Sequence, residues 1–364
     1  MNSGRRTRWL AGATGLTAVG ALAGTTVTQA LTRRTSTDDP YAGEDFEMLR
    51  DDPGCVVTTP DGVPLMVREV GDPQAPVTVV FAHGFCLRKA AFHFQRVRLL
   101  REWGDQVRMI FYDQRGHGES GTADPATYTV PQLGRDLESV LQVMAPRGPI
   151  VVVGHSMGAM TLLAHARQHP EQYGPRIVGA ALLSSAAEGV DRSPLGEILQ
   201  NPALESVRFA ARYAPALLHR GRGVVRSVIG PILRAGSYGD GKVSPSVVRF
   251  SEQMMHDTAI TTMVEFLHAL EVHDESAALA VLARVPTLIA CGDHDLLTPD
   301  ENSRAMADAM TGAQSNCELL IIPGAGHLLP LEVPDIVDDA LVQLVQRATP
   351  NTLVSVPRRL NRRA

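Results

Sequence analysis

The chain has 364 residues, of which 44% are hydrophobic and 20% are charged, and its formal net charge is −5 at pH 7. These values are typical of a globular protein and give no reason to expect nucleic acid as a partner, because nucleic-acid binding needs a basic surface. The four cysteines, Cys55, Cys86, Cys291 and Cys317, are too few and too scattered for a disulfide framework or a Cys-x-x-Cys metal site.

The first 34 residues differ from the rest of the chain. Three arginines precede an uncharged run over residues 9–32, and two arginines follow it. At about 1.5 Å per residue such a run can span a bilayer, and paired arginines before a mildly apolar run also fit an export signal. We therefore expect residues 1–34 to form a membrane anchor or export signal at the cell membrane or in the cell envelope, with an ordinary N-terminus as the remaining alternative. The polar, turn-rich residues 35–54 predict a linker or a loose N-terminal arm.

Apolar runs and apolar residues at helical spacing alternate along the remainder of the chain. Strands are expected over residues 55–59, 63–70, 77–82, 107–112, 150–153, 177–183, 285–290 and 317–322. Helices are expected over residues 91–103, 130–144, 159–167, 301–310 and 334–346. Strands followed by helices over at least four units predict an α/β fold, with a mostly parallel central sheet covered by helices on both faces.

Residues 187–284 interrupt this alternation. They hold few β-branched runs and predict helices, among them an apolar stripe of Met255, Ala259, Met263, Phe266, Leu267 and Leu270. We expect a helical cap inserted over the sheet. Its Met254, Met255, Met263, Phe266 and Leu267 would either line a pocket for an acyl chain or pack the cap onto the core. Residues 347–364 hold several arginines and prolines and are expected to form a basic tail.

A serine nucleophile is predicted at the centre of the chain. Gly154-His155-Ser156-Met157-Gly158 is an instance of G-x-S-x-G, and it lies between an expected strand and an expected helix. Such a sharp turn pushes the serine out of the sheet, and small flanking residues let the backbones pass. The N–H groups that follow lie at a helix N-terminus, which favours an anion.

A histidine and a carboxylate can complete this site. His327 follows the strand 317–322 in a glycine-rich loop, and Asp295 follows the strand 285–290. Both therefore lie at the carboxyl edge of the sheet, as Ser156 does. A histidine can take the serine proton because its pKa lies near neutral pH, and a carboxylate can orient the imidazole ring. Asp293 and Glu188 are the alternative acids.

Five motifs in this order carry a family resemblance. They are His83-Gly84, Asp113-x-Arg115-Gly116-His117-Gly118-x-Ser120, Gly154-x-Ser156-x-Gly158, Gly292-x-x-Asp295-x-x-x-Pro299 and Gly326-His327. From about residue 56 to residue 346 the chain resembles the α/β-hydrolase superfamily, in the branch with a helical cap. The resemblance implies a core over residues 55–186 and 285–346, and oxyanion-hole N–H groups on Phe85 and Met157. It also implies that residues 113–120 buttress the site.

The expected chemistry is acyl transfer to water. A Ser156–His327–Asp295 triad predicts hydrolysis of carboxylic esters, lipid or acyl esters among them, through an acyl-enzyme, with no cofactor and no metal. A serine at position 156 argues against epoxide hydrolases and dehalogenases, which resemble this branch but hold aspartate there. Carbon–carbon bond hydrolases and cofactor-free peroxidases use the same triad and remain alternatives, as does a non-enzymatic scaffold. His165 and His169 are four residues apart but lack an acid between them, so surface helix positions are expected rather than metal ligands.

Overall fold

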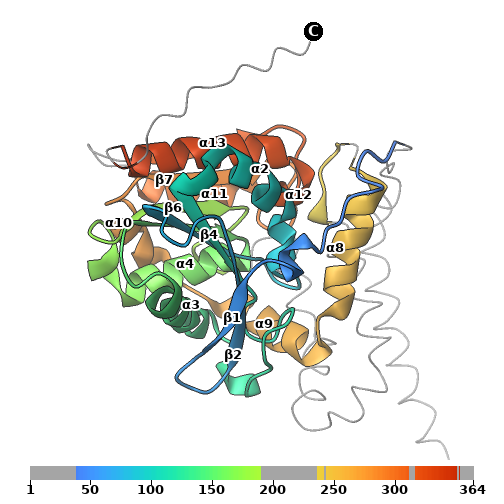
Figure 1. Cartoon of the computed structure of the whole chain (residues 1–364). Coiled ribbons are helices and arrows are strands. Elements are labelled where there is room, and N and C mark those ends of the chain that lie inside the picture. Colours follow the sequence, from blue (N-terminus) through green and yellow to red (C-terminus); the bar gives the residue numbers. More distant parts are fainter. Residues whose placement is uncertain (1–37, 190–235, 242, 311–315, 351, 353–364) are drawn as a thin grey trace, which may run out of the picture.

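Among the residues that the structure describes, eight strands form one sheet in the order β1-β2-β4-β3-β5-β6-β7-β8. We describe a computed structural model over residues 38–189, 236–241, 243–310, 316–350 and 352 (Figure 1). The strands are β1 (Gly54–Thr58), β2 (Pro64–Val70), β3 (Val77–Ala82), β4 (Val107–Tyr112), β5 (Ile150–His155), β6 (Ile177–Leu183), β7 (Thr287–Gly292) and β8 (Cys317–Ile322). Strand β2 pairs antiparallel with β1 and β4, and all other pairs are parallel.

Helices cover both faces of this sheet and also form the cap. They are α2 (His93–Trp103), α3 (Val130–Met144), α4 (Met157–Gln168), α8 (Pro245–Asp257), α9 (Ile260–Val272), α10 (Leu279–Leu282), α11 (Asp300–Ala309), α12 (Leu329–Glu332) and α13 (Pro334–Ala348). Helices α8 and α9 form the described part of the cap. Short 3₁₀ helices are η1 (Met48–Arg50), η2 (Lys89–Phe92), η3 (Gly104–Gln106), η4 (Pro125–Thr127), η5 (Pro170–Gln172) and η6 (Ser276–Ala278). The predicted parallel sheet between two helical layers is confirmed.

The core has one apolar layer on each face of the sheet. Every residue of β3, β5 and β7 is buried, which requires cover on both sides. Because side chains alternate along a strand, Val80 and Val152 pack with helices α3 and α4, while Phe81 and Val153 pack with α2 and α13. Burying each such side chain contributes about 1.5–3 kcal/mol, and together they fix the strands that carry the site.

The predicted apolar stripe of the cap belongs to two helices. Met255 lies on α8, whereas Met263, Phe266 and Leu270 lie on α9. Thr258 and Ala259 between them are extended, with ψ of 132° and 141°. The Thr258 hydroxyl donates to the Met254 carbonyl at 3.1 Å and so satisfies an acceptor at the end of α8. No proline or glycine marks this break in the sequence. Residues 190–235 of the predicted cap lie outside the described residues.

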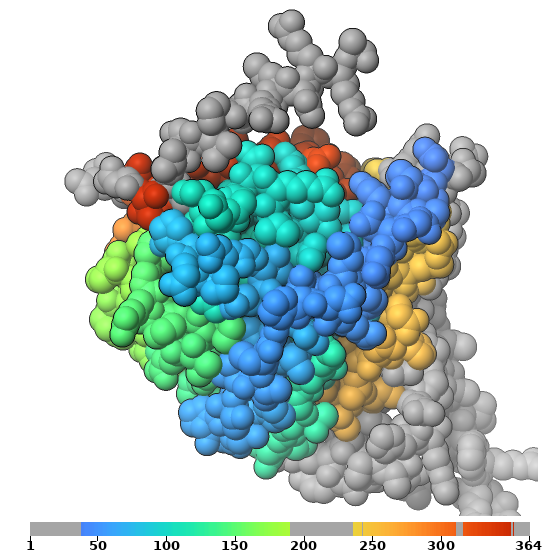
Figure 2. Space-filling model, in the orientation of Figure 1, coloured from blue at the N-terminus to red at the C-terminus, as the bar shows by residue number. Residues whose placement is uncertain are grey.

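The segment predicted as a linker packs against the cap over the part that the structure describes. Asp39 accepts hydrogen bonds from the Ser244 and Ser246 hydroxyls at the start of α8. The Phe46 ring stacks on the Phe250 ring with centroids 4.6 Å apart, and Leu49 is buried. Figure 2 shows this blue segment lying against the yellow of α8. The linker prediction for residues 35–54 is therefore wrong from Asp39 onward, because aromatic residues among the polar ones give the segment a surface to bury.

Two further predictions concern the ends of the chain. Those for residues 1–34 lie outside the described residues. Across the part that is described, no helix combines the length and the apolar character needed to cross a membrane. The basic tail expected over residues 347–364 begins later than predicted, because helix α13 continues to Ala348. Most of the tail lies outside the described residues.

Two buried polar groups join α2 to α13. The Gln95 amide donates to Asp338 Oδ1 at 2.9 Å, and Asp338 is fully buried. Its other oxygen, Oδ2, has no hydrogen-bond partner among the described residues. Burial raises the pKa of Asp338 to about 7, because a charged carboxylate loses its hydration there. The neutral acid is therefore the favoured form in the folded protein below that pH.

Candidate active site

Ser156 lies at a sharp turn between β5 and α4. Its backbone has φ 53° and ψ −119°, a strained conformation for a non-glycine residue. The flanking glycines make this turn possible. A Cβ on Gly154 would lie 2.5 Å from the Ala159 nitrogen, and one on Gly158 would lie 2.0 Å from the Ala82 carbonyl oxygen. The turn thus lifts the serine side chain out of the sheet, as the motif predicts.

The structure brings the three residues of the predicted triad together. His327 Nε2 lies 2.9 Å from Ser156 Oγ, and His327 Nδ1 lies 2.8 Å from Asp295 Oδ2. Asp295 follows β7 and His327 follows β8, and both strands run parallel to β5. All three side chains are buried. Parallel strands that end at one edge therefore place together groups that are far apart in the sequence.

The surroundings of Asp295 hold it in the ionised form. Burial alone would raise the pKa of Asp295, but the neighbouring His327 and hydrogen bonds from Thr298 outweigh this effect and lower it. Its Oδ1 accepts the backbone N–H groups of Leu297 and Thr298, each at 2.9 Å. An ionised carboxylate can only accept, so His327 Nδ1 must carry the ring hydrogen of the neutral imidazole. Nε2 then accepts the Ser156 hydroxyl, which is the arrangement that a general base requires.

The two alternative acids lie elsewhere. Asp293 is partly exposed, and its Oδ1 accepts the Gly324 N–H at 2.6 Å. Glu188 lies in a short antiparallel bridge to Asp274. Asp295 is therefore the carboxylate that the structure places on His327.

The predicted oxyanion hole combines a loop and a helix start. Met157 is the first residue of α4, where backbone N–H groups have no acceptor within the helix. Phe85 follows Gly84 in the loop after β3. A Cβ on Gly84 would lie 2.7 Å from His155 Nδ1 and 3.2 Å from Ser156 Cβ. This close approach brings the loop that carries Phe85 against the predicted nucleophile.

Residues 113–120 brace that loop, as the resemblance implies. The Cys86 N–H donates to His117 Nε2 at 3.2 Å. Asp113 is fully buried and accepts both the Lys89 backbone N–H at 2.7 Å and the Lys89 ammonium at 2.6 Å. Burial of Lys89 could not be predicted from the sequence, because its partner Asp113 lies 24 residues further along the chain. Burial raises the pKa of the Cys86 thiol, so this cysteine stays in the unreactive thiol form.

His155 holds the loop that carries His327 in place. Its Nε2 lies 2.8 Å from the His327 carbonyl oxygen, which can only accept, so Nε2 carries the hydrogen. Burial lowers the pKa of His155 to about 3 and keeps the ring neutral. His155 thereby ties the backbone of His327 to the end of β5, next to Ser156.

A cavity opens beside Ser156 and His327. Its apolar lining among the described residues is Phe85, Leu87, Met160, Met255, Leu270, Leu297 and Leu328. Of the cap residues singled out in the sequence, Met255 and Leu270 line the cavity, while Met263, Phe266 and Leu267 pack into a buried cluster. Met254 packs into a separate cluster with Phe250. For most of this set the packing interpretation therefore holds.

Several known proteins are similar to this chain. The profile of the Alpha/beta hydrolase family matches residues 79–340. The "Probable oxidoreductase EphD" of Mycobacterium tuberculosis is 30% identical over 114 residues, which cover 31% of this chain and only 18% of that protein's length. The monoacylglycerol lipase of Mycolicibacterium smegmatis is 24% identical over 273 residues, covering 72% of this chain and 86% of the lipase. A solved thermophilic esterase from Thermogutta terrifontis aligns with a TM-score of 0.65 and 25% identity, over 81% of this chain and 99% of the esterase.

Proposed function

The chain belongs to the alpha/beta hydrolase family, and we propose that it is a serine hydrolase that cleaves carboxylic esters through an acyl-enzyme. The observation that carries this proposal is the hydrogen-bonded series from Asp295 through His327 to Ser156, with distances of 2.8 and 2.9 Å. Support also comes from the names of its relatives, which include an esterase and a monoacylglycerol lipase.

In the first half of the proposed reaction, Ser156 Oγ attacks the carbonyl carbon of the ester. His327 Nε2 takes the serine proton as the new carbon–oxygen bond forms. The carbonyl oxygen becomes an oxyanion, which the N–H groups of Met157 and Phe85 stabilise. The bond to the alcohol then breaks, and His327 gives its proton to the departing oxygen. The acyl group remains on Ser156.

In the second half, water removes the acyl group. His327 takes a proton from the water as its oxygen attacks the acyl carbon, and the same N–H groups stabilise the second oxyanion. The bond to Ser156 breaks, His327 returns the proton to Oγ, and a carboxylic acid leaves. Asp295 keeps the ring oriented and stabilises the imidazolium in both halves.

The proposed substrates are esters with an apolar acyl group. The support is the cavity beside Ser156, whose described lining is chiefly aliphatic, aromatic and thioether side chains. Apolar surface buried from water stabilises binding by about 25 cal/mol for each Å². Met255 suits chains of varied shape, because its thioether side chain is flexible.

The test is hydrolysis of a series of p-nitrophenyl esters from acetyl to palmitoyl. Ser156→Ala is expected to lower kcat by about 10⁴-fold or more. Ser139→Ala on α3, outside the site, is the matched control and should match the unmodified enzyme. A fluorophosphonate probe should label the protein but not the Ser156→Ala variant. Ester hydrolysis that persists in Ser156→Ala would refute the proposal, and labelling without hydrolysis of any ester would favour carbon–carbon bond hydrolysis or peroxidase chemistry.

We also propose that residues 1–34 place the enzyme at the cell membrane or in the cell envelope. The support is the uncharged run over residues 9–32 between arginines. Cell fractionation of the full chain and of a chain lacking residues 1–34 tests this. The full chain should be found with the membranes or outside the cytoplasm, and equal distribution of both chains would refute the proposal.

A further inference from the structure

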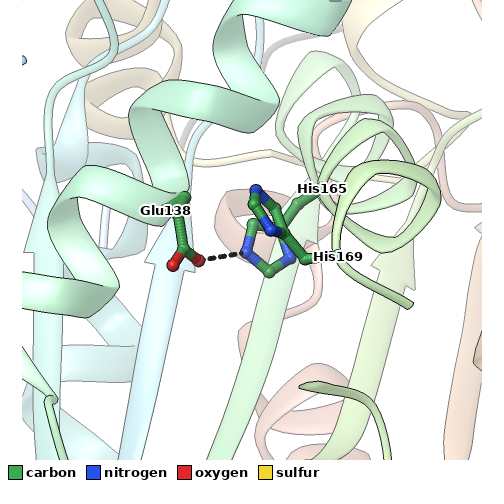
Figure 3. A group of neighbouring side chains, drawn as sticks. All are labelled: Glu138, His165 and His169. Atoms are coloured by element: carbon green, nitrogen blue, oxygen red, sulfur yellow. Dashed lines mark hydrogen bonds and ion pairs between the residues drawn. The ribbon is translucent and has the colours of Figure 1, made fainter. Parts of the chain in front are cut away.

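Three side chains of types that bind metals in other proteins meet between α3 and the C-terminal end of α4, none of which belongs to the proposed triad, oxyanion hole or cavity lining. They are Glu138 from α3 and His165 and His169 from the last turn and end of α4 (Figure 3). One ligand atom from each lies within 4.8 Å of the others. His165 is fully buried, contrary to the surface position expected from the sequence, because it packs against Glu138, 27 residues earlier in the chain.

The two histidines lie side by side, and the carboxylate points toward them. The ring centroids of His165 and His169 are 4.9 Å apart. His165 Nε2 lies 2.8 Å from Glu138 Oε2. Residues four apart on a helix share a face, which explains how one helix presents both rings. The side chain of His169 remains 29% exposed, so an ion can reach the group from solvent.

Surrounding residues orient these groups. The amides of Gln142 and Gln172 donate to the two oxygens of Glu138 at 2.8 and 3.0 Å. The Tyr173 hydroxyl lies 3.1 Å from His165 Nδ1 and can donate its own hydrogen to the Leu162 carbonyl. Without a metal, His165 Nε2 carries the ring hydrogen and donates it to the Glu138 carboxylate. When a metal ion takes the place of that hydrogen, Nδ1 can carry the ring hydrogen and donate it to the Tyr173 hydroxyl, which leaves the Nε2 lone pair for the metal. Partners of this kind fix the tautomer and the orientation of histidines that bind metals.

We propose that Glu138, His165 and His169 bind one zinc ion. Two imidazoles and one carboxylate are a ligand set that zinc takes in proteins, with bonds of about 2.0–2.2 Å and a fourth position for water. Tetrahedral bonds of that length separate the ligand atoms by roughly 3.3 Å. His165 and Glu138 separate slightly to reach this spacing, and the partly exposed His169 moves inward. Binding joins α3 to α4, the helix that follows Ser156 directly.

The test uses the full chain, first dialysed against a chelator and then titrated with Zn²⁺ by calorimetry. The unmodified protein is expected to bind one equivalent, and His169→Ala should weaken binding at least tenfold. His268→Ala is the matched control, since this exposed histidine on α9 also lies beside a glutamate, with 3.5 Å between His268 Nδ1 and Glu271 Oε2. Co²⁺ in place of Zn²⁺ should give the visible absorption of a tetrahedral site.

Glu138→Gln is a second variant, which keeps the shape of the side chain and removes its charge. It should also weaken binding at least tenfold, and circular dichroism of each variant checks the fold. Equal zinc binding by the unmodified protein and by both variants would overturn the proposal, as would an equal loss in His268→Ala. Binding is measured without substrate, so the result is independent of the proposed hydrolase activity.

Discussion

Asp295→Asn tests the proposed triad most directly, because the structure fixes how the new amide must lie. In the protein, Oδ1 accepts the N–H groups of Leu297 and Thr298, and Oδ2 accepts the His327 ring. If the asparagine turned its NH₂ group toward the backbone, two buried N–H groups would lose their acceptor, at about 1–3 kcal/mol each. The amide oxygen therefore stays at the Oδ1 position, and the amide nitrogen faces His327.

An amide nitrogen at the Oδ2 position reverses the function of the ring. It donates to His327 Nδ1, 2.8 Å away in the unmodified protein, so the ring hydrogen must move to Nε2. Nε2 faces Ser156 and can then no longer take its proton. We expect kcat for ester hydrolysis to fall about 10⁴-fold, which is about 5 kcal/mol in activation free energy.

The assay is single-substrate kinetics on the best p-nitrophenyl ester, with thermal unfolding as a check on the fold. Asp293→Asn is the control, because Asp293 is partly exposed, follows the same strand and contacts Gly324 instead of His327. It should keep activity within a few-fold of the unmodified enzyme. An Asp295→Asn enzyme within tenfold of normal, or a greater loss in Asp293→Asn, would refute the reasoning.

Two further predictions concern the loop after β3 that carries Phe85 and the buried carboxyl group of Asp338. In Gly84→Ala the new Cβ would lie 2.7 Å from His155 Nδ1, so the loop carrying Phe85 must shift. We expect kcat to fall about 10²–10³-fold with the fold retained, and unchanged kinetics would show that this loop takes no part. The pKa of Asp338 is about 7 in the folded protein, whereas an ordinary aspartate has a pKa of 3.8. Between these two pH values the unfolded chain ionises Asp338 and the folded protein does not. The stability that the neutral acid contributes is therefore complete below pH 3.8 and is lost as the pH rises to about 7. Asparagine does not ionise, so Asp338→Asn removes this loss. Urea unfolding should show that the free energy of unfolding of the variant exceeds that of the unmodified protein by up to about 4 kcal/mol at about pH 8, and that the difference becomes smaller toward about pH 4. A difference that does not change with pH would contradict this prediction.

Much of the sheet could be predicted because its signal is local. The runs that became β3, β4, β6 and β8 are short, apolar and bounded by turn residues, and each begins and ends where the sequence indicates. The α/β-hydrolase resemblance is confirmed by the matching family profile. Once the strands are parallel, residues that follow them must meet at one edge, which is why His327 and Asp295 could be placed beside Ser156.

What could not be predicted depends on partners far away in the sequence. The sequence around His165 is compatible with either a buried or an exposed side chain. His165 is buried because it packs against Glu138, which lies on another helix. Lys89 likewise resembles a surface residue until Asp113 is placed beside it. The break between α8 and α9 carries no proline or glycine, so helical spacing continues across it in the sequence alone.

The packing of residues 39–50 on α8 limits how far the protein can be truncated from its N-terminus. A chain begun at residue 54, where the sheet starts, would uncover the Phe250 ring and leave the Ser244 and Ser246 hydroxyls without Asp39. Newly exposed aromatic surface promotes aggregation, and α8 would lose contacts that hold it against the core. A shortened protein intended for purification should therefore retain Asp39 and everything after it, even though this segment contributes no residue to the triad.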